Sequence, residues 1–169
     1  VALVMLAGQA ARAEFQWAAM DGTLDFEAGA VYGTQGVEDA QNRPGRRDEA
    51  VSWTGSDGAL WLFGGYGYDG AGSQGRLNDL WRYDPASGNW TWMKGASTVG
   101  QYGTYGTLGA ADPANNPGAR NSAVSWTDSS GALWLFGGYG YDGAGSQGRL
   151  NDLWKYDPAT GNWTWMKGA

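Results

Sequence analysis

The side chains of this sequence that could take part in chemistry are carboxylates, arginines, lysines, tyrosines and hydroxyls. The 169 residues include no cysteine and no histidine, which excludes a thiol nucleophile, a Ser-His-Asp triad, a Cys/His zinc site and a disulfide within them. The segment 69–73 (DGAGS) resembles an acidic calcium loop, but it has one carboxylate where calcium takes about six to eight oxygen ligands. We therefore predict no catalytic residue, no metal site and no cofactor here.

Tyrosine and arginine in glycine-rich segments are the candidates for contacting a ligand. The segment 66–78 (YGYDGAGSQGRLN) recurs unchanged at 139–151, and the segment 96–119 between the copies is rich in Gly, Tyr, Asn and Pro. Tyrosine gives broad amphipathic contacts at low entropic cost, and Gly, Ser and Asn adapt around it. The predicted binding residues are Tyr66, Tyr68, Asp69, Gln74, Arg76, Tyr102, Tyr105, Tyr139, Tyr141, Asp142, Gln147 and Arg149. The alternative is that these tyrosines pack the segments onto the rest of the fold.

An internal repeat must position these residues. Residues 50–96 and 123–169 align without gaps at an offset of 73. They differ only at Gly55/Asp128, Asp57/Ser130, Arg82/Lys155 and Ser87/Thr160. Weaker matches carry the same period back to Trp17. A fixed period of this kind indicates one supersecondary unit that is present in successive copies.

Four short runs between turn signals predict antiparallel strands in each repeat. In the first repeat they are Ala50–Thr54, Ala59–Phe63, Asp79–Tyr83 and Trp90–Lys94. The second run has apolar residues on both faces, so the sheet needs cover on both sides, as a propeller blade does. We interpret Trp53, Trp61, Trp81, Trp90 and Trp92 as core residues.

The direction of the strands decides where the candidate ligand residues lie. Consecutive antiparallel strands alternate direction. The segments 66–78 and 96–119, which follow the second and fourth strands, therefore leave the sheet at the same end of its strands. The turns at the opposite end of the strands, 55–58 and 84–89, are short. Long loops on one side only are typical of a scaffold with one working face.

The residues at these positions resemble the kelch motif. The first set is Arg47, Gly64-Gly65, Tyr83-Asp84 and Trp90, and the second is Arg120, Gly137-Gly138, Tyr156-Asp157 and Trp163. The resemblance covers 47–95 and 120–168, and Trp17–Gly22 matches the last strand of a preceding unit, although 73 residues exceed the usual kelch unit of about 50. We expect Arg47 and Arg120 to form structural ion pairs.

This resemblance implies an all-β, kelch-type β-propeller. The chain would hold two four-stranded antiparallel blades, at 47–95 and 120–169, separated by an inter-blade loop at 96–119. Residues 14–46 would form the end of a preceding blade and its loop, including that blade's outer strand. Two blades cannot close a ring of about four to eight, so further blades are expected from a longer chain or from other copies.

The N-terminal residues and the net charge restrict the surroundings of the protein. Residues 1–13 (VALVMLAGQAARA) look like the end of a signal peptide with an A-x-A cleavage site, which predicts export; a buried first strand or helix is the alternative. The apolar run is too short to span a bilayer. The net charge of −6 without a basic cluster argues against nucleic-acid binding.

The sequence thus favours a non-catalytic extracellular module that contacts a protein or glycan through its long-loop face. Near-identical units offer repeated contacts, which suit avidity, whereas an active site normally needs different residues from different blades. One alternative is part of a kelch-propeller enzyme of the galactose oxidase kind, with catalytic residues outside this segment. Another is a repetitive structural surface protein.

Overall fold

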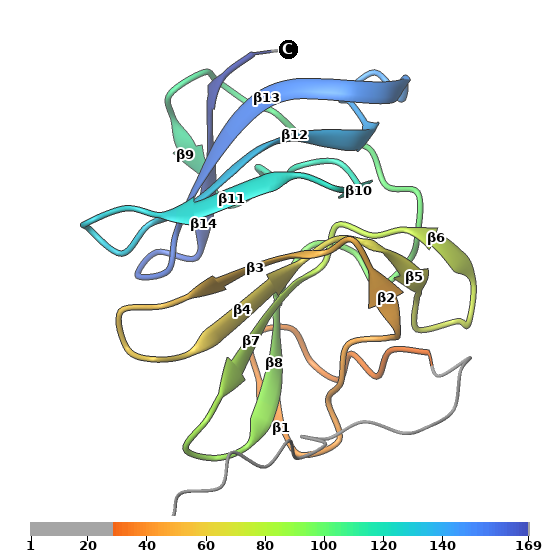
Figure 1. The fold of residues 1–169 in the computed structure, drawn as a ribbon, viewed down its shortest axis with the longest axis vertical. Coiled ribbons are helices and arrows are strands. Elements are labelled where there is room, and N and C mark those ends of the chain that lie inside the picture. The colour runs from red at the N-terminus through yellow and green to blue at the C-terminus, as the bar shows by residue number, and fades with distance from the viewer. Residues whose placement is uncertain (1–28, 169) are drawn as a thin grey trace, which may run out of the picture.

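The computed structural model describes residues 29–168, which form strands joined by turns and bends (Figure 1). No helix occurs among these residues, so the predicted all-β class is confirmed for them. Their strands form three antiparallel sheets, and none of the three closes into a barrel. A helix long and apolar enough to cross a membrane is absent from this part of the chain. The predicted leader at 1–13 and the strand match at Trp17–Gly22 lie outside the described residues.

The first sheet contains the four strands predicted for the first repeat and has the order β1-β8-β7-β4-β3. The bounds are Glu38–Asp39 (β1), Val51–Thr54 (β3), Leu60–Phe63 (β4), Leu80–Asp84 (β7) and Asn89–Lys94 (β8). The four predictions are therefore confirmed to within one residue at each end. The turns close where glycine was expected: Gly58 and Gly88 have φ values of +82° and +76°, which glycine adopts without strain.

The second sheet repeats this arrangement with longer inner strands, in the order β10-β12-β13-β14-β9 with β11 paired to β12. The bounds are Ala111–Asp112 (β9), Arg120–Asn121 (β10), Val124–Thr127 (β11), Leu133–Tyr141 (β12), Gln147–Asp157 (β13) and Asn162–Lys167 (β14). Both sheets exceed the four strands predicted per unit. The reason is that β1 and β9, from the segments before each repeat, pair with the outer strands β8 and β14, and that β10 pairs with β12 in the second sheet.

The segment 66–78 is a β-hairpin, and the prediction of a long loop there is wrong. Strand β5 (Tyr66–Tyr68) pairs with β6 (Gln74–Arg76), and β2 (Arg47–Asp48) pairs with β5 to complete the small third sheet. In the second repeat the equivalent hairpin is continuous with β12 and β13. Glycine and serine have low strand propensity, so the composition concealed a pairing that backbone hydrogen bonds supply.

The backbone of Arg120 joins the two repeats beside this hairpin. The amide of Gly65 donates to the carbonyl of Arg120 (2.8 Å), and the amide of Arg120 donates to the carbonyl of Leu77 (3.0 Å). In the second repeat the equivalents of Gly65 and Leu77, Gly138 and Leu150, are ladder partners within β12 and β13. In the first repeat, Arg120 thus bonds to Gly65 and Leu77 at the place where the second repeat has a direct pair between its strands.

The main core lies between the first and second sheets, which stack face to face (Figure 1). Trp61 and Phe63 of β4 pack against Tyr156 and Trp163, with ring centroids 5.5 and 5.6 Å apart. The predicted core residues Trp53, Trp61 and Trp81 are buried, whereas Trp90 and Trp92 are half-buried. The stacking places the two hairpins at the same side of the molecule, where β5, β6 and the adjoining ends of β12 and β13 lie (Figure 1).

Candidate binding surface

An aspartate fixes the tip of each hairpin. Asp69 Oδ1 accepts hydrogen bonds from the amides of Ala71 (2.9 Å) and Ser73 (2.8 Å), and its Oδ2 accepts one from the amide of Val99 (3.1 Å). Asp142 makes the first two bonds at the tip of the other hairpin. Both carboxylates thus shape turns. No group of three or more His, Cys, Asp or Glu side chains that could hold a metal ion occurs within residues 29–168.

The other predicted residues of the hairpins are opposite one another in the strand register. Tyr66 pairs with Arg76 and Tyr68 with Gln74 across β5 and β6. The second hairpin repeats this arrangement with the pairs Tyr139/Arg149 and Tyr141/Gln147. Opposite residues on one face of a sheet have neighbouring side chains, so each hairpin presents the same two polar-aromatic pairs.

A cation between two aromatic rings connects the hairpins. The guanidinium carbon of Arg76 lies 5.8 Å from the ring centroid of Tyr66 and 4.5 Å from that of Tyr139. Arg76 Nε donates to Asn121 Oδ1 (2.8 Å), which fixes the orientation of the guanidinium plane. Both tyrosines are exposed. The three side chains form a continuous surface across the boundary between the repeats, which we call the Tyr66–Arg76–Tyr139 cluster.

Two depressions have predicted binding tyrosines in their walls. One, of about 250 Å³, is lined by Tyr66, Tyr68 and Gln74 together with Arg46. The other, of about 310 Å³, is lined mostly by polar residues, among them Lys94, with the exposed Tyr102 at its wall.

Tyr102 connects the second depression to the second hairpin, because its ring lies 5.7 Å from that of Tyr141. Lys94 and Pro113 both line this depression, and Lys94 Nζ donates to the carbonyl of Pro113 (2.7 Å). Burial lowers the pKa of the Lys94 ammonium. The site therefore combines an aromatic wall with amide and ammonium donors.

Tyr105 does not join this surface. Its ring packs 4.8 Å from Trp154 and edge-on at 5.1 Å from Trp165, and its hydroxyl donates to Asp152 Oδ2 (2.6 Å). Burial and the bond to Asp152 raise the pKa of Tyr105. Tyr32, one repeat earlier, makes the same contacts with Asp79 and the first sheet. Tyr105 therefore packs its segment onto the rest of the fold, which is the alternative role considered for these tyrosines.

The ion pairs predicted for Arg47 and Arg120 are present and buried. Arg47 donates to both oxygens of Asp79 (2.6 and 2.8 Å), and Arg120 does the same to Asp152 at the same distances. Each arginine also donates to two backbone carbonyls. Burial alone would raise the pKa of Asp152, but the hydrogen bonds and charge of Arg120 lower it. These pairs hold the strands that carry the hairpins.

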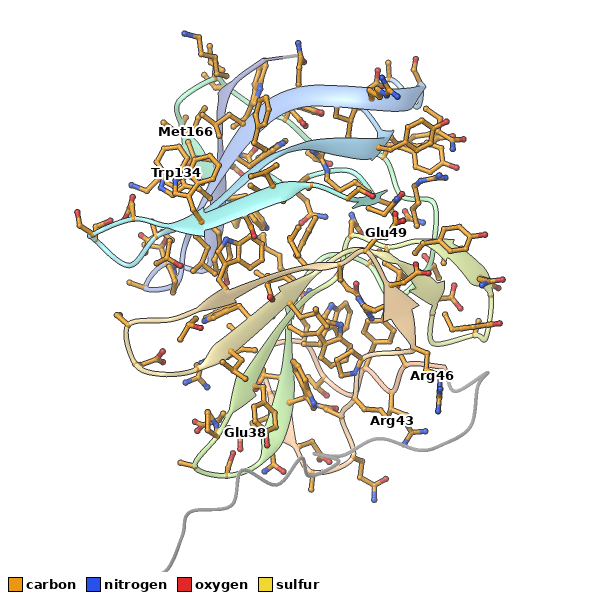
Figure 2. All side chains as sticks on the ribbon, in the orientation of Figure 1. Glu38, Arg43, Arg46, Glu49, Trp134 and Met166 are labelled. Carbon is orange, nitrogen blue, oxygen red and sulfur yellow. The ribbon has the colours of Figure 1, made fainter. Side chains whose placement is uncertain are left out.

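Sequence reasoning missed Asn121 and the group around Glu49. Glu49 accepts hydrogen bonds from Ser122 Oγ (2.6 Å) and from the Asn121 amide, and these bonds lower the pKa of Glu49. Figure 2 shows Glu49 at the boundary between the sheets. Glu49 and Ser122 occupy equivalent positions and share a positive φ, +51° and +57°. Because they belong to different repeats, the sequence offers no sign that they touch.

No protein-family model matches the sequence, and no curated protein is significantly similar to it. The fold does have relatives among solved structures. One, entitled "Structure of YjhT", superposes with a TM-score of 0.54 at 18% sequence identity. The match covers 77% of this chain and 40% of the other, so the present chain spans less than half the length of that protein. At this identity the likeness concerns the fold alone.

Proposed function

We propose that the chain is part of an exported kelch-type β-propeller that acts as a non-catalytic binding module for a protein or glycan. Two features support the propeller: the repeated glycine pairs, which follow β4 and interrupt the register of β12, and the stacking of two sheets of near-identical sequence face to face. The binding surface is the side that carries the hairpins, with Tyr66, Arg76 and Tyr139 at its centre.

The Tyr66–Arg76–Tyr139 cluster is the observation that supports a binding role. Tyrosine and arginine are enriched among residues that dominate the energy of interfaces, and these three are placed on hydrogen-bonded strands, with Asn121 holding the arginine. A fixed arginine and aromatic rings on strands lose little conformational entropy on binding. The exposed rings of Tyr66 and Tyr139 suit either a sugar ring or an apolar protein patch with polar edges.

Alanine substitution of the two tyrosines tests this role. The labelled chain is first applied to a glycan array and a protein array to find what it retains. The variant carrying Tyr66→Ala and Tyr139→Ala should then bind each retained probe at least about tenfold more weakly, since interface tyrosines of this kind contribute more than 1 kcal/mol.

Leu108→Ala provides the matched control, because it also truncates an exposed apolar side chain but lies outside the hairpins. It should leave the affinity unchanged. The proposal is wrong if every probe bound by the parent chain is bound equally well by the double-tyrosine variant.

A further inference from the structure

Within residues 29–168, one face of the second sheet exposes a group of apolar side chains. We call it the tryptophan face, and it consists of Val124, Trp126, Trp134 and Phe136. The exposed fractions of Val124, Trp126 and Phe136 are 59%, 42% and 43%. Trp126 and Trp134 stack with their planes 7° apart, and Figure 2 shows Trp134 on the side of the sheet that points away from the first sheet. Exposed apolar patches of this kind mark interaction sites.

The same residues are buried in the first repeat. The equivalents of the tryptophan face, one period earlier, are Val51, Trp53, Trp61 and Phe63. Their exposed fractions are 8%, 5%, 3% and 1%. What buries them is the second sheet, through Leu133, Leu135, Tyr156 and Trp163, all of which are fully buried. Within the chain, this side of the second sheet is therefore the surface that covers a tryptophan face.

The residues of that partner recur one period earlier in the first sheet, where Leu60 is exposed, Leu62 and Trp90 are half-buried and Tyr83 is buried. In the first sheet the equivalent residues form what we call the leucine face: Leu60, Leu62, Tyr83 and Trp90. Leu60 is 45% exposed, whereas its equivalent Leu133 is fully buried. None of the eight residues of the two faces is among the four positions at which the repeats differ, but two of those positions touch Trp134: Asp128 accepts a hydrogen bond from its indole (2.7 Å), and Lys155 Nζ lies 5.7 Å from its ring centroid.

We infer that a second copy of this chain docks its leucine face onto the tryptophan face. The contact reproduces the one between the two sheets within the chain, where Trp61 meets Tyr156, Phe63 meets Trp163, and Trp53 Nε1 donates to the carbonyl of Trp134. The partner is a second copy because its leucine face has the residues of the internal one, position for position.

The two faces are different surfaces, so the association is head-to-tail. Each added copy covers one face and brings a new uncovered one, and such a heterologous contact continues beyond a dimer. This behaviour distinguishes it from a symmetric dimer, in which one surface meets itself and association stops at two chains.

Charged substitutions in each face, combined in a mixture, test the inference by light scattering after size-exclusion chromatography. The parent chain should show a mass that rises above two chains with concentration. Phe136→Asp removes the tryptophan face and Leu60→Asp the leucine face, and each should lower the association constant at least about tenfold, as for central interface residues. Both positions are solvent-exposed, so circular dichroism should show the parent fold; Val124→Asp is a second variant of the tryptophan face.

The decisive sample is the equimolar mixture of Phe136→Asp and Leu60→Asp. Each variant retains the face that the other lacks, so the mixture should form a one-to-one dimer and nothing larger. Ala86→Asp adds the same charge in the exposed turn between β7 and β8 and should associate like the parent. A monomeric parent chain, association that survives either substitution, or a mixture that stays monomeric would each overturn the inference.

Discussion

At the scale of single residues, Asp152 is a buried carboxylate that accepts four side-chain hydrogen bonds. It accepts two hydrogen bonds from Arg120 and one each from Tyr105 and the indole of Trp154. Asp79 has the same four bonds in the first repeat, from Arg47, Tyr32 and Trp81. A buried charge that is fully paired is tolerated, but removing its partner leaves an uncompensated charge.

Asp152→Asn should therefore lower the free energy of unfolding by about 3 kcal/mol at neutral pH, because it leaves the buried Arg120 without its counter-charge. Urea denaturation followed by tryptophan fluorescence measures this. The folded pKa of Asp152 lies below its ordinary value, so its stabilisation is present above the unfolded pKa of about 3.9 and is lost as the pH falls below it. The difference between parent and variant should shrink accordingly in acid.

The exposed pair Arg82–Asp57 is the control for this experiment. Its atoms are 2.9 Å apart, but more than half of the Asp57 side chain is exposed. Asp57→Asn should cost less than about 1 kcal/mol, as exposed ion pairs do. Equal losses in the two variants would show that burial is not what makes the Arg120 pair important.

At the scale of elements, the glycine pair after β4 decides how the hairpin leaves the sheet. Gly65 has a φ of +96°, and a Cβ built on it would lie 2.6 Å from the carbonyl oxygen of Asp48. Gly58, in the turn between β3 and β4, has a similar φ of +82° but no atom within 4 Å of its Cβ position. Substitutions at these two glycines therefore distinguish the strain of a positive φ, which both share, from a clash with the backbone, which only Gly65 would suffer.

Gly65→Ala should consequently destabilise the chain by about 3 kcal/mol and Gly58→Ala by about 1 kcal/mol, the latter being the strain of a left-handed alanine alone. Thermal unfolding of both variants, compared with the parent, provides the measurement. Similar losses at the two glycines would contradict the close approach between Gly65 and β2.

The elements that local sequence determines were predictable, and those that depend on distant partners were not. Strands β3, β4, β7 and β8 follow from alternation and glycine turns within a few residues. Strand β1 has two residues and pairs with β8 more than 50 residues away, a distance over which no local pattern operates. The same limit applied to the site. Packing was an alternative for Tyr105, but its partner Asp152 is 47 residues away in sequence and could not be identified from a local pattern.

At the scale of the whole molecule, identical sequences occupy different environments in the two sheets. The sequence predicted that both faces of each sheet need cover, but nothing in two matching copies indicates which face meets its partner within the chain. Phe63 is buried against Trp163, whereas Phe136, at the equivalent position, is exposed. Stacking order alone produces this difference.

Phe63→Ala should therefore lower the free energy of unfolding by about 3 to 5 kcal/mol, the usual cost of deleting a buried phenylalanine. Phe136→Ala should cost less than about 1 kcal/mol when the chain is dilute enough to be monomeric, because it leaves no cavity. Chemical denaturation of the two variants measures both values. Equal values would mean that the two positions are equally covered.

The head-to-tail contact between the sheets also affects how this part of the protein can change in length. Residues 50–96 and 123–169 align without gaps, so a duplication or deletion of 73 residues joins the chain in register wherever in this unit the junction falls. Wherever two such sheets remain next to each other, a leucine face still meets a tryptophan face. Gains and losses of whole units would thus leave the fold of each unit intact, and homologous genes should differ in unit number more readily than in unit length.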